Sequence, residues 1–317
     1  MSANDKTDPV AQDIEEFDLA GCTQLAKGMR STTYKVDDET ILKLFPPFID
    51  ADFVSAEREM ARSAFVAGIP TAIPFKLVRC GSSYGALYEL LDGTTLSEKI
   101  SGAADDAEAA SWGERMADLL GEIHRHPVQI KELRDLKMEA IRRTKALGDT
   151  LPSDAAQSII ECFNVIPESG TMVHGQFDPA HIIMRDGQLM LVGMENAGYG
   201  HPLFDLVHTF SSCIFPNLHK PDDTVVTIGV SQHRAEVMWD ALLRRYFGTD
   251  DERAIDAKKK LIWGYAVGVL ITSPLLDELP EEAGTPEGLR KMFLDGLLPH
   301  LPEMVEASHN LPVWWSL

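Results

Sequence analysis

The chain has 317 residues, 44% of them hydrophobic and 25% charged, which is the balance of a globular protein with one large or two modest domains. Its formal net charge of -20 excludes the broadly basic surface that nucleic acid or an anionic membrane would require. This acidity suits a cationic small molecule, and it equally suits simple solubility.

The chain begins with a polar leader. Residues 1–14 contain no apolar core of the kind that a secretory signal needs, and we expect them to be disordered. Four cysteines follow at wide intervals, with no Cys-x-x-Cys spacing: Cys22, Cys80, Cys162 and Cys213. This usage predicts reduced, mostly buried thiols in a cytoplasmic protein, and it favours neither a disulfide framework nor a zinc site.

Residues 15–91 have the pattern of a small β-rich lobe with one helix. Alternating and β-branched residues predict strands over 23–26, 32–36, 40–45, 75–80 and 84–91. Apolar residues at helical spacing predict a helix from Asp52 to Ala67, which ends at Gly68. Lys43 is a single cation in an apolar strand, and by itself it would be interpreted as a lysine on a solvated face.

Residues 92–317 have the pattern of a larger, mainly helical lobe. A period near 3.6 in the apolar residues predicts helices over 112–123, 131–146, 153–166, 233–246 and 251–273. We expect loops at 217–223 and 277–288, and helical structure to resume after Phe210. Trp314-Trp315 predicts either a segment docked on this lobe or a subunit contact.

The centre of the chain predicts a β-hairpin. A polar loop, His174 to His181, precedes a short apolar run, Ile182 to Met184. The chain then turns at Arg185-Asp186-Gly187 and continues as a second apolar run, Leu189 to Val192. Asp-Gly between apolar segments is a strong hairpin signal. The hairpin would place the polar loop beside the residues that follow its second strand, Gly193 to Asn196.

This central stretch resembles the catalytic core of the aminoglycoside phosphotransferases and their choline-kinase-like relatives, a branch of the protein-kinase-like fold. His174-Gly175 matches the family's first loop, which reads His-Gly-Asp, then four residues, then Asn. The run from Ala197 to Leu206 matches as well, although the family usually has Asp at the position of His201. The resemblance implies an α+β, two-lobed fold, with a small antiparallel β lobe carrying one helix and a larger helical lobe built on the hairpin.

The residues that carry the family's chemistry are replaced. Gln176 stands at the position of the catalytic Asp, His181 at that of the metal-binding Asn, and Gly193 at that of the metal-binding Asp. A neutral amide cannot act as a base near pH 7, glycine has no side-chain oxygen, and magnesium prefers oxygen ligands to nitrogen. The catalytic loop (174–181) and the metal loop (193–196) are therefore degenerate, which argues against ordinary kinase chemistry.

The resemblance also implies a nucleotide site in the small lobe, with ATP or another nucleotide as the ligand. The residues expected to bind it are Gly28, Ser31, Thr32, Lys43, Glu57, Glu89 and Leu91. Among them, Lys43 corresponds to the strand lysine that pairs with the phosphates, and Glu57 to its glutamate partner on the following helix. Glu59 is the alternative for that partner.

Further polar residues allow a rearranged site. Asp178 is a candidate substitute base, and Glu195 with His181 is a candidate metal site, so a role for magnesium stays open. Asp205 and His174 are expected to support the loop through hydrogen bonds to its backbone.

Three hypotheses share this fold and differ at the site. In the first, the chain is a pseudokinase that keeps a nucleotide-shaped cleft and acts by binding or regulating a partner. In the second, it is an active ATP-dependent phosphotransferase for a hydroxyl of an aminoglycoside-like or choline-like molecule. In the third, it performs another nucleotide chemistry such as adenylyl transfer. The expected partners are a nucleotide and either a small cationic substrate or a protein, and neither a nucleic acid nor a membrane.

Overall fold

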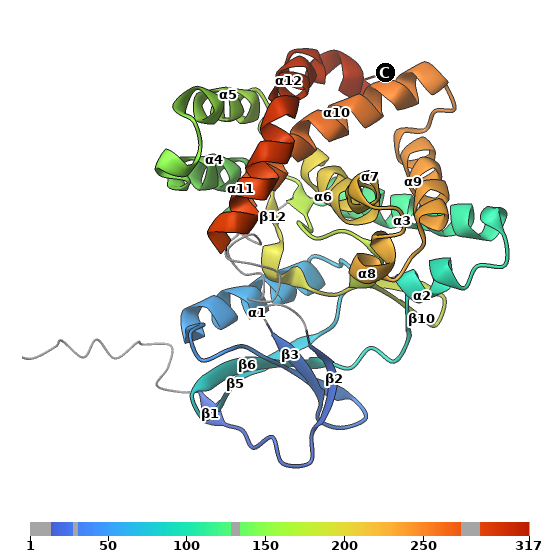
Figure 1. The fold of residues 1–317 in the computed structure, drawn as a ribbon. Coiled ribbons are helices and arrows are strands. Elements are labelled where there is room, and N and C mark those ends of the chain that lie inside the picture. The colour runs from blue at the N-terminus through green and yellow to red at the C-terminus, as the bar shows by residue number, and fades with distance from the viewer. Residues whose placement is uncertain (1–13, 28–30, 128–133, 274–285, 317) are drawn as a thin grey trace, which may run out of the picture. The chain divides into compact units, whose positions relative to one another are not determined.

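The computed structural model describes residues 14–27, 31–127, 134–273 and 286–316, and the chain divides into two compact units. The small unit comprises Met1–Gly93 and Met190–Glu195, and the large unit comprises Thr94–Leu189 and Asn196–Leu317. Strands dominate the first and helices the second (Figure 1). The expected α+β architecture is therefore confirmed. The predicted lobe boundary, after Leu91, lies two residues before the end of the first segment of the small unit at Gly93. Residues 193–195 of the expected metal loop also belong to the small unit.

A six-stranded sheet in the order β1-β5-β6-β4-β3-β2 forms most of the small unit. Its strands are β1 (Glu15–Glu16), β2 (Thr23–Lys27), β3 (Thr32–Lys35), β4 (Thr40–Leu44), β5 (Pro74–Cys80) and β6 (Ser83–Glu89). Neighbours run antiparallel, except for the short β1, which pairs in parallel with β5. The buried Leu42, Val78 and Leu87 form a core on this sheet. Lys43 therefore lies on an inner strand, opposite Thr33 and Ala86.

Helix α1 (Ala51–Val66) is the helix expected in this unit. It begins at Asp50, whose carboxylate accepts a hydrogen bond from the backbone N–H of Phe53, the usual role of an aspartate at an N-cap. Its buried face carries Val54, Met60 and one carboxylate, Glu57. The helix packs on β5 and β6, so this acidic side chain is held against the sheet.

The central hairpin is present as expected. It consists of β10 (Ile182–Arg185) and β11 (Gln188–Leu191), and β7 (Thr94–Thr95) adds a third strand beside β10. Asp186 has φ 49° and Gly187 has φ 83°, which are the two left-handed residues of the hairpin turn that Asp-Gly favours. The one-turn helix η4 (Met194–Asn196) follows the hairpin.

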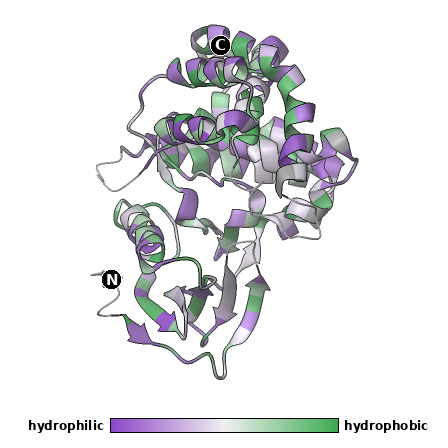
Figure 2. Ribbon diagram, turned by 60° about the vertical axis from the view of Figure 1, so that its left-hand side comes forward, coloured by the Kyte–Doolittle hydropathy of each residue, from purple (hydrophilic) through white to green (hydrophobic). Residues whose placement is uncertain are grey.

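Eleven of the described helices and their short connecting elements make up the rest of the large unit. The helices are α2 (Leu96–Ser101), α3 (Asp106–Arg125), α4 (Leu136–Ala146), α5 (Ser153–Asn164), α6 (Leu203–Cys213), α7 (Phe215–His219), α8 (Thr224–Ile228), α9 (Gln232–Phe247), α10 (Glu252–Ile271), α11 (Pro286–Leu297) and α12 (Leu301–Ser316). A small sheet joins β8 (Arg134–Asp135), β12 (Gly198–Tyr199) and β9 (Met172–Val173). Hydrophobic and hydrophilic residues alternate along most of the helices in Figure 2, as expected of helices with one buried face. The most extensive contacts join α3 to α9 and α10 to α12.

Several boundaries differ from the sequence prediction. Helix α3 begins at Asp106 rather than at residue 112, and Arg134–Asp135, predicted as helix, forms β8 before α4. Helix α6 begins at Leu203 rather than after Phe210. Its N-cap residue, Pro202, makes no side-chain capping hydrogen bond, so no capping signal in the sequence marks this start. Helix α7 extends to His219, so the loop expected at 217–223 begins later. The predicted leader, apart from Ile14, and most of the loop predicted at 277–288 lie outside the described residues.

The C-terminal helix is docked within the large unit. Trp315 contacts the rings of His201 and Phe247, at 4.5 Å and 5.3 Å between centroids. Lys258 donates hydrogen bonds to the carbonyls of Trp314 and Trp315, each at 2.6 Å, and so satisfies the end of α12. The first of the two alternatives for Trp314-Trp315, a docked segment, is confirmed.

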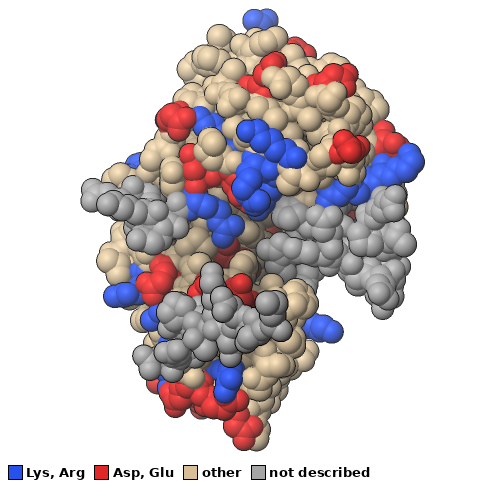
Figure 3. Space-filling model, turned by 90° about the vertical axis from the view of Figure 1, so that its left-hand side faces the viewer, with Lys and Arg blue, Asp and Glu red and all other residues tan. Residues whose placement is uncertain are grey.

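The surface and the cysteines agree with the composition. Basic side chains on the face shown in Figure 3 have acidic side chains beside them. All four cysteines lie in described residues and are free thiols, with Cys162 and Cys213 buried. None of the helices in the described ranges combines the length and the hydropathy of a membrane-crossing segment.

Candidate functional site

Lys43 of β4 is held between two carboxylates in the small unit. Its Nζ lies 2.8 Å from Oε1 of Glu57 on α1 and 2.9 Å from Oε2 of Glu195 on η4. All three side chains are largely buried, with 15%, 4% and 18% of their surfaces exposed, respectively. The structure thus places Glu57 at Lys43, whereas Glu59 pairs with Arg58 at 2.6 Å. Glu195 is an additional partner that the sequence suggested only as a metal ligand.

Burial and charge together set the protonation of this group. Burial raises the pKa of the Glu57 carboxyl to about 7, Lys43 opposes the rise, and the neighbouring Glu195 adds to it. Burial works against the charged form of Lys43 as well, but Glu57 and Glu195 outweigh it, and the pKa of Lys43 is raised. Lys43 therefore stays charged, while the two carboxylates compete for one cation.

The segment from Glu89 to Leu91, which includes two of the residues expected to bind a nucleotide, already makes backbone hydrogen bonds within the small unit. The backbone N–H of Glu89 donates to the carbonyl of Ile73 at 2.9 Å, and that of Leu90 donates to the carbonyl of Glu39 at 2.7 Å. Ser31 and Thr32 lie at the start of β3, and Gly28 lies outside the described residues.

Asp205 supports the degenerate catalytic loop in the large unit. Its carboxylate is fully buried and accepts hydrogen bonds from the backbone N–H groups of His174 (2.9 Å) and Gly175 (2.7 Å). Its Oδ2 also lies 3.0 Å from Nε2 of His124. Burial works against the charged form of Asp205, but these contacts hold the pKa of its carboxyl below the ordinary value. The hydrogen bond with His124 makes the largest contribution to this lowering of the pKa. Asp205 thus makes the supporting contacts expected from the sequence.

Gly175 and His174 complete the support from the loop side. Gly175 has φ +76°, and a Cβ there would lie 2.2 Å from the carbonyl oxygen of Asn196, so only glycine fits this close approach. His174 is fully buried, and its Nδ1 accepts a hydrogen bond from the backbone N–H of Gln176 at 3.2 Å. The loop geometry is therefore retained although its reactive residue is not.

Asp178 has a structural environment rather than that of a base. Its Oδ1 accepts hydrogen bonds from the backbone N–H groups of Ala180 (2.9 Å) and His181 (3.2 Å), which caps the one-turn helix η3 (Pro179–His181). The same oxygen lies 2.9 Å from Nδ1 of His181, and Oδ2 lies 3.3 Å from Nε2 of His208. Burial opposes its charged form, but His181 and then His208 hold the pKa of the Asp178 carboxyl well below its usual range. Such a carboxylate does not take up a proton near neutral pH, which argues against Asp178 as the substitute base.

The side chains at the family's metal positions do not fit magnesium. His181 presents an imidazole engaged with Asp178, and Gly193, with φ +77°, presents no side chain. Glu195, the remaining candidate, is paired with Lys43. Among the described residues, no group of three His, Cys, Asp or Glu side chains is placed to hold a metal ion. Gln176 carries a buried Oε1 to which no residue in the described ranges donates a hydrogen bond.

Sequence reasoning missed three supporting residues. His124 joins Asp205 to Tyr246, with 3.0 Å from its Nε2 to Oδ2 of Asp205 and 2.6 Å from its Nδ1 to the phenol oxygen of Tyr246. His208 and Tyr88, which lies 3.4 Å from Glu57, were not singled out. No short-range signal could have found them, because their partners lie in other elements of the fold.

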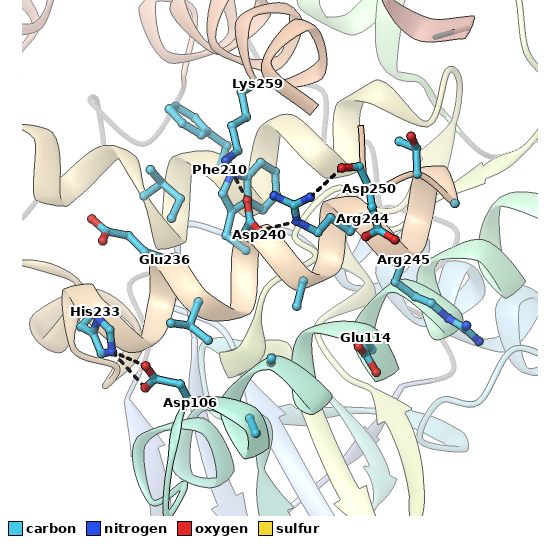
Figure 4. A pocket seen from close by; sticks show the side chains of 18 residues that line it. Asp106, Glu114, Phe210, His233, Glu236, Asp240, Arg244, Arg245, Asp250 and Lys259 are labelled. Carbon is cyan, nitrogen blue, oxygen red and sulfur yellow. Dashed lines mark hydrogen bonds and ion pairs between the residues drawn. The ribbon is translucent and has the colours of Figure 1, made fainter. Parts of the chain in front are cut away.

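A separate hollow of about 1190 Å³ lies in the large unit beside α3 and α9 (Figure 4). Its charged side chains are largely paired with one another. Asp106 lies 2.9 Å from His233, and Asp240 binds Arg244 at 2.6 Å and Lys259 at 2.8 Å. The lining of this hollow therefore has mixed charge.

A sequence model of the phosphotransferase enzyme family matches residues 21–239, which is more than half of the chain. The match spans Lys43, Glu57 and the whole of the degenerate loop. No curated protein matches the chain.

Solved structures with this fold are similar along most of the chain. The aminoglycoside phosphotransferase APH(2'')-Ib, in its ADP-bound form, has a TM-score of 0.58 and 15% identity, and the match covers 94% of this chain and 95% of that one. The streptomycin–ATP complex of APH(2'')-IIa has a TM-score of 0.56 and 16% identity, with 90% and 93% covered. A choline/ethanolamine kinase family protein from Mesorhizobium loti has a TM-score of 0.54 and 15% identity, with 90% and 92% covered. At such low identity the likeness establishes the fold alone, and it confirms the two-lobed, protein-kinase-like fold.

Proposed function

We propose that this chain, which belongs to the phosphotransferase enzyme family, is a pseudokinase that binds a nucleotide in its small unit without magnesium-dependent phosphoryl transfer. One contrast supports the proposal above all others. The Lys43–Glu57 ion pair is intact at 2.8 Å, whereas the base and metal positions hold Gln176, His181 and Gly193.

The chemistry of phosphoryl transfer explains why this contrast supports the proposal. The protein's part in that reaction is to position the reactants and to neutralise charge on the transferred group, which the family does with metal-held oxygen ligands. Gln176 is neutral and does not accept a proton near pH 7. Gly193 and His181 supply no oxygen for magnesium. A nucleotide could be held by such a protein, but its γ-phosphate would meet neither a base nor a bridging cation.

A nucleotide is the expected ligand because the small unit retains the family's frame. Two of the similar structures contain ADP or ATP, which makes an adenine nucleotide the first candidate for this chain. We propose that the bound chain acts by regulating a partner in the cytoplasm, since its own site offers no route to a product.

A second candidate function is an active phosphotransferase with a histidine base. The observation in its favour is the pairing of His181 Nδ1 with the buried carboxylate of Asp178, because a carboxylate that orients an imidazole is the arrangement used by histidine general bases. In that case His181, and not Asp178, would take the proton of the acceptor hydroxyl. The first acceptors to test are aminoglycosides and small amino alcohols, which the names of the similar structures suggest.

A turnover assay separates the two functions. The full chain is incubated with radiolabelled ATP and magnesium or manganese, together with streptomycin, gentamicin, choline or ethanolamine, and ADP release is measured. We expect no turnover above buffer, and we expect any shift of the unfolding midpoint by nucleotide to be the same in magnesium as in EDTA. Brisk, magnesium-dependent turnover that His181→Ala abolishes would instead establish the second function.

A further inference from the structure

We propose that Cys22 and Cys80 form a redox-active thiol pair in the small unit, which a low-molecular-weight disulfide converts to an intramolecular disulfide. Both are free thiols and are half-buried, so a small reagent can reach them, whereas Cys162 and Cys213 are buried. This inference goes beyond the proposed nucleotide binding and does not depend on it, since neither cysteine is among the residues expected to bind the nucleotide.

Cys80 is the last residue of β5 and packs against the buried core of the small unit's sheet. The chain that leads to β2 passes this end of β5. Strand β1 pairs in parallel with β5, with Glu16 opposite Arg79, and the backbone N–H of Phe17 donates to the carbonyl of Arg79 at 2.7 Å. The segment that follows β1 therefore begins beside Cys80.

Cys22 lies at the other end of that segment, directly before β2. Its backbone N–H donates to the carbonyl of Leu19 at 3.0 Å, which closes a turn. The antiparallel pairing of β2 with β3 begins one residue after Cys22, so Cys22 and Val36 are neighbours at the end of these two strands. Leu19 and Val36 both pack against the core that Cys80 contacts. Folding therefore brings the two cysteines to the same end of one core.

The electrostatics of Cys80 agree with this placement. Burial raises the pKa of the Cys80 thiol, and three neighbouring groups that carry negative charge raise it further: Glu16, Cys22 and Asp18. Because the interaction between two charges weakens with distance, the influence of Cys22 on Cys80 agrees with two sulfurs at one end of the core. A thiol with a raised pKa is seldom a thiolate, so we assign the first attack on the reagent to Cys22.

The oxidation consists of two exchange steps. In the first, the thiolate of Cys22 attacks one sulfur of the reagent disulfide, so that a mixed disulfide forms and one reagent thiol leaves. In the second, the thiolate of Cys80 attacks the sulfur of Cys22, the bond between the two cysteines forms, and the second reagent thiol leaves. The two cysteine thiols are oxidised together, and the reagent disulfide is reduced to two thiols. An excess of a reducing thiol reverses both steps.

The new bond would constrain the small unit. It would tie the start of β2, an edge strand, to the end of β5, on the other side of β3, β4 and β6 in the sheet. A bond between residues so far apart in the sequence restricts the unfolded chain, and this stabilises the folded state. The oxidised small unit should therefore unfold at a higher temperature than the reduced one.

Oxidation of the folded chain tests the pair. The full chain is freed of reductant, incubated with glutathione disulfide, alkylated with iodoacetamide and digested, and intact and peptide masses are measured. For the wild type we expect the intact mass to fall by two hydrogen atoms before alkylation, and a peptide that joins Cys22 to Cys80. We also expect the unfolding midpoint to rise by roughly 5 °C and to return to its first value in dithiothreitol.

Single variants make the test specific. Cys22→Ala and Cys80→Ala should each abolish the joined peptide and the rise in the unfolding midpoint. Cys162→Ala is the matched control, because it removes a thiol from the large unit, and it should behave like the wild type. Unfolding midpoints in dithiothreitol establish that each variant is folded, and Cys80→Ser takes the place of Cys80→Ala if the latter is not.

Three results would overturn the inference. A folded wild type that carries only mixed disulfides with glutathione would show that the two thiols do not reach each other. A wild type that stays reduced would show that the pair is not redox-active. A joined peptide that forms as readily in denaturant as in the folded chain would show that the fold does not bring the two cysteines together.

Discussion

The Lys43 group in the small unit and the His174–His181 loop in the large unit differ in how much of the family pattern they keep. The small unit keeps the lysine and its glutamate, and Lys43 pairs with Glu195 as well. The large unit keeps the support of its loop, through Asp205, and loses the reactive group at Gln176. One region has kept its charged group, and the other has lost a charge that the reaction requires.

This difference shows which residues folding itself demands. Asp205 satisfies buried backbone N–H groups and Gly175 permits a close backbone approach, so their replacement would cost stability whether or not the loop catalyses anything. A base at position 176 and an oxygen ligand at position 193 serve only the reaction. The loop can therefore lose its chemistry and keep its shape.

Restoring the reactive residues should have the largest effect. We expect the triple variant Gln176→Asp, His181→Asn and Gly193→Asp to hydrolyse ATP in magnesium roughly 100-fold faster than the wild type, because a positioned acid–base group contributes about that much or more. Gly193 has φ +77°, a region that aspartate enters more readily than most residues. Release of ADP is the measurement, and Gln176→Asp alone is the control, since it leaves the metal positions unfilled. A folded triple variant without activity would show that the degeneracy extends beyond these positions.

Removing the carboxylate that supports the His174–His181 loop should have the next largest effect. Asp205→Ala should lower the free energy of unfolding by about 3 kcal/mol, because it strands two buried backbone N–H groups and His124. Denaturant unfolding of the full chain measures the loss. The matched control is Asp118→Ala, since Asp118 is an exposed aspartate paired with Arg245 and should matter little. Equal losses in the two variants would contradict the assignment of Asp205 as the support of the loop.

The Lys43 group should make stability depend on pH. The pKa of Glu57 is raised from 4.5 to about 7, so the folded state binds more protons than the unfolded state between these values. This contribution to stability is complete below pH 4.5 and is lost as the pH rises through about 7. His201, whose pKa burial lowers to about 4, acts in the opposite direction, so the difference between wild type and Glu57→Gln is the informative quantity.

Unfolding midpoints from pH 4.5 to 8 measure that difference. The advantage of the wild type over Glu57→Gln should shrink as the pH rises. A constant difference across this range would mean that Glu57 titrates normally.

The smallest effect is expected at His208. Its Nε2 lies 3.3 Å from Asp178, which keeps three other hydrogen bonds, so His208→Ala should lower the free energy of unfolding by only ~1 kcal/mol. ADP release should stay at the buffer level. A loss as large as that of Asp205→Ala would show that the Asp178 cluster, and not Asp205, carries the loop.

Much of the fold could be predicted from local sequence patterns. Alternation predicted β3, β4 and the later strands of the small unit, and Asp186-Gly187 predicted the hairpin turn that the structure contains. The short strands β7, β8, β9 and β12 were not predicted, because two residues carry too little pattern. The early start of α6 was missed for a similar reason, since Pro202 and Leu203 give no capping signal.

The contacts of the site were less accessible to prediction. His124 and Asp205 are separated by 81 residues, and nothing in either neighbourhood indicates the other. The sequence indicates Glu195 as a candidate metal ligand, whereas its partner in the structure is Lys43. The sequence could not predict that hydrogen bonds engage both carboxylate oxygens of Asp178, because one of the partners, His208, lies on another helix.

The amino-acid sequence by itself indicated most strands and helices and the hairpin, because periodicity and turn chemistry are local properties of the chain. Its resemblance to the aminoglycoside phosphotransferases implied the fold class and the replaced base and metal positions. Only the tertiary structure decided that Lys43 faces two carboxylates and that Asp178 is engaged by two imidazoles. The physical reason is that a side chain's protonation and availability depend on burial and on partners brought from distant segments, and these exist only once the chain has folded.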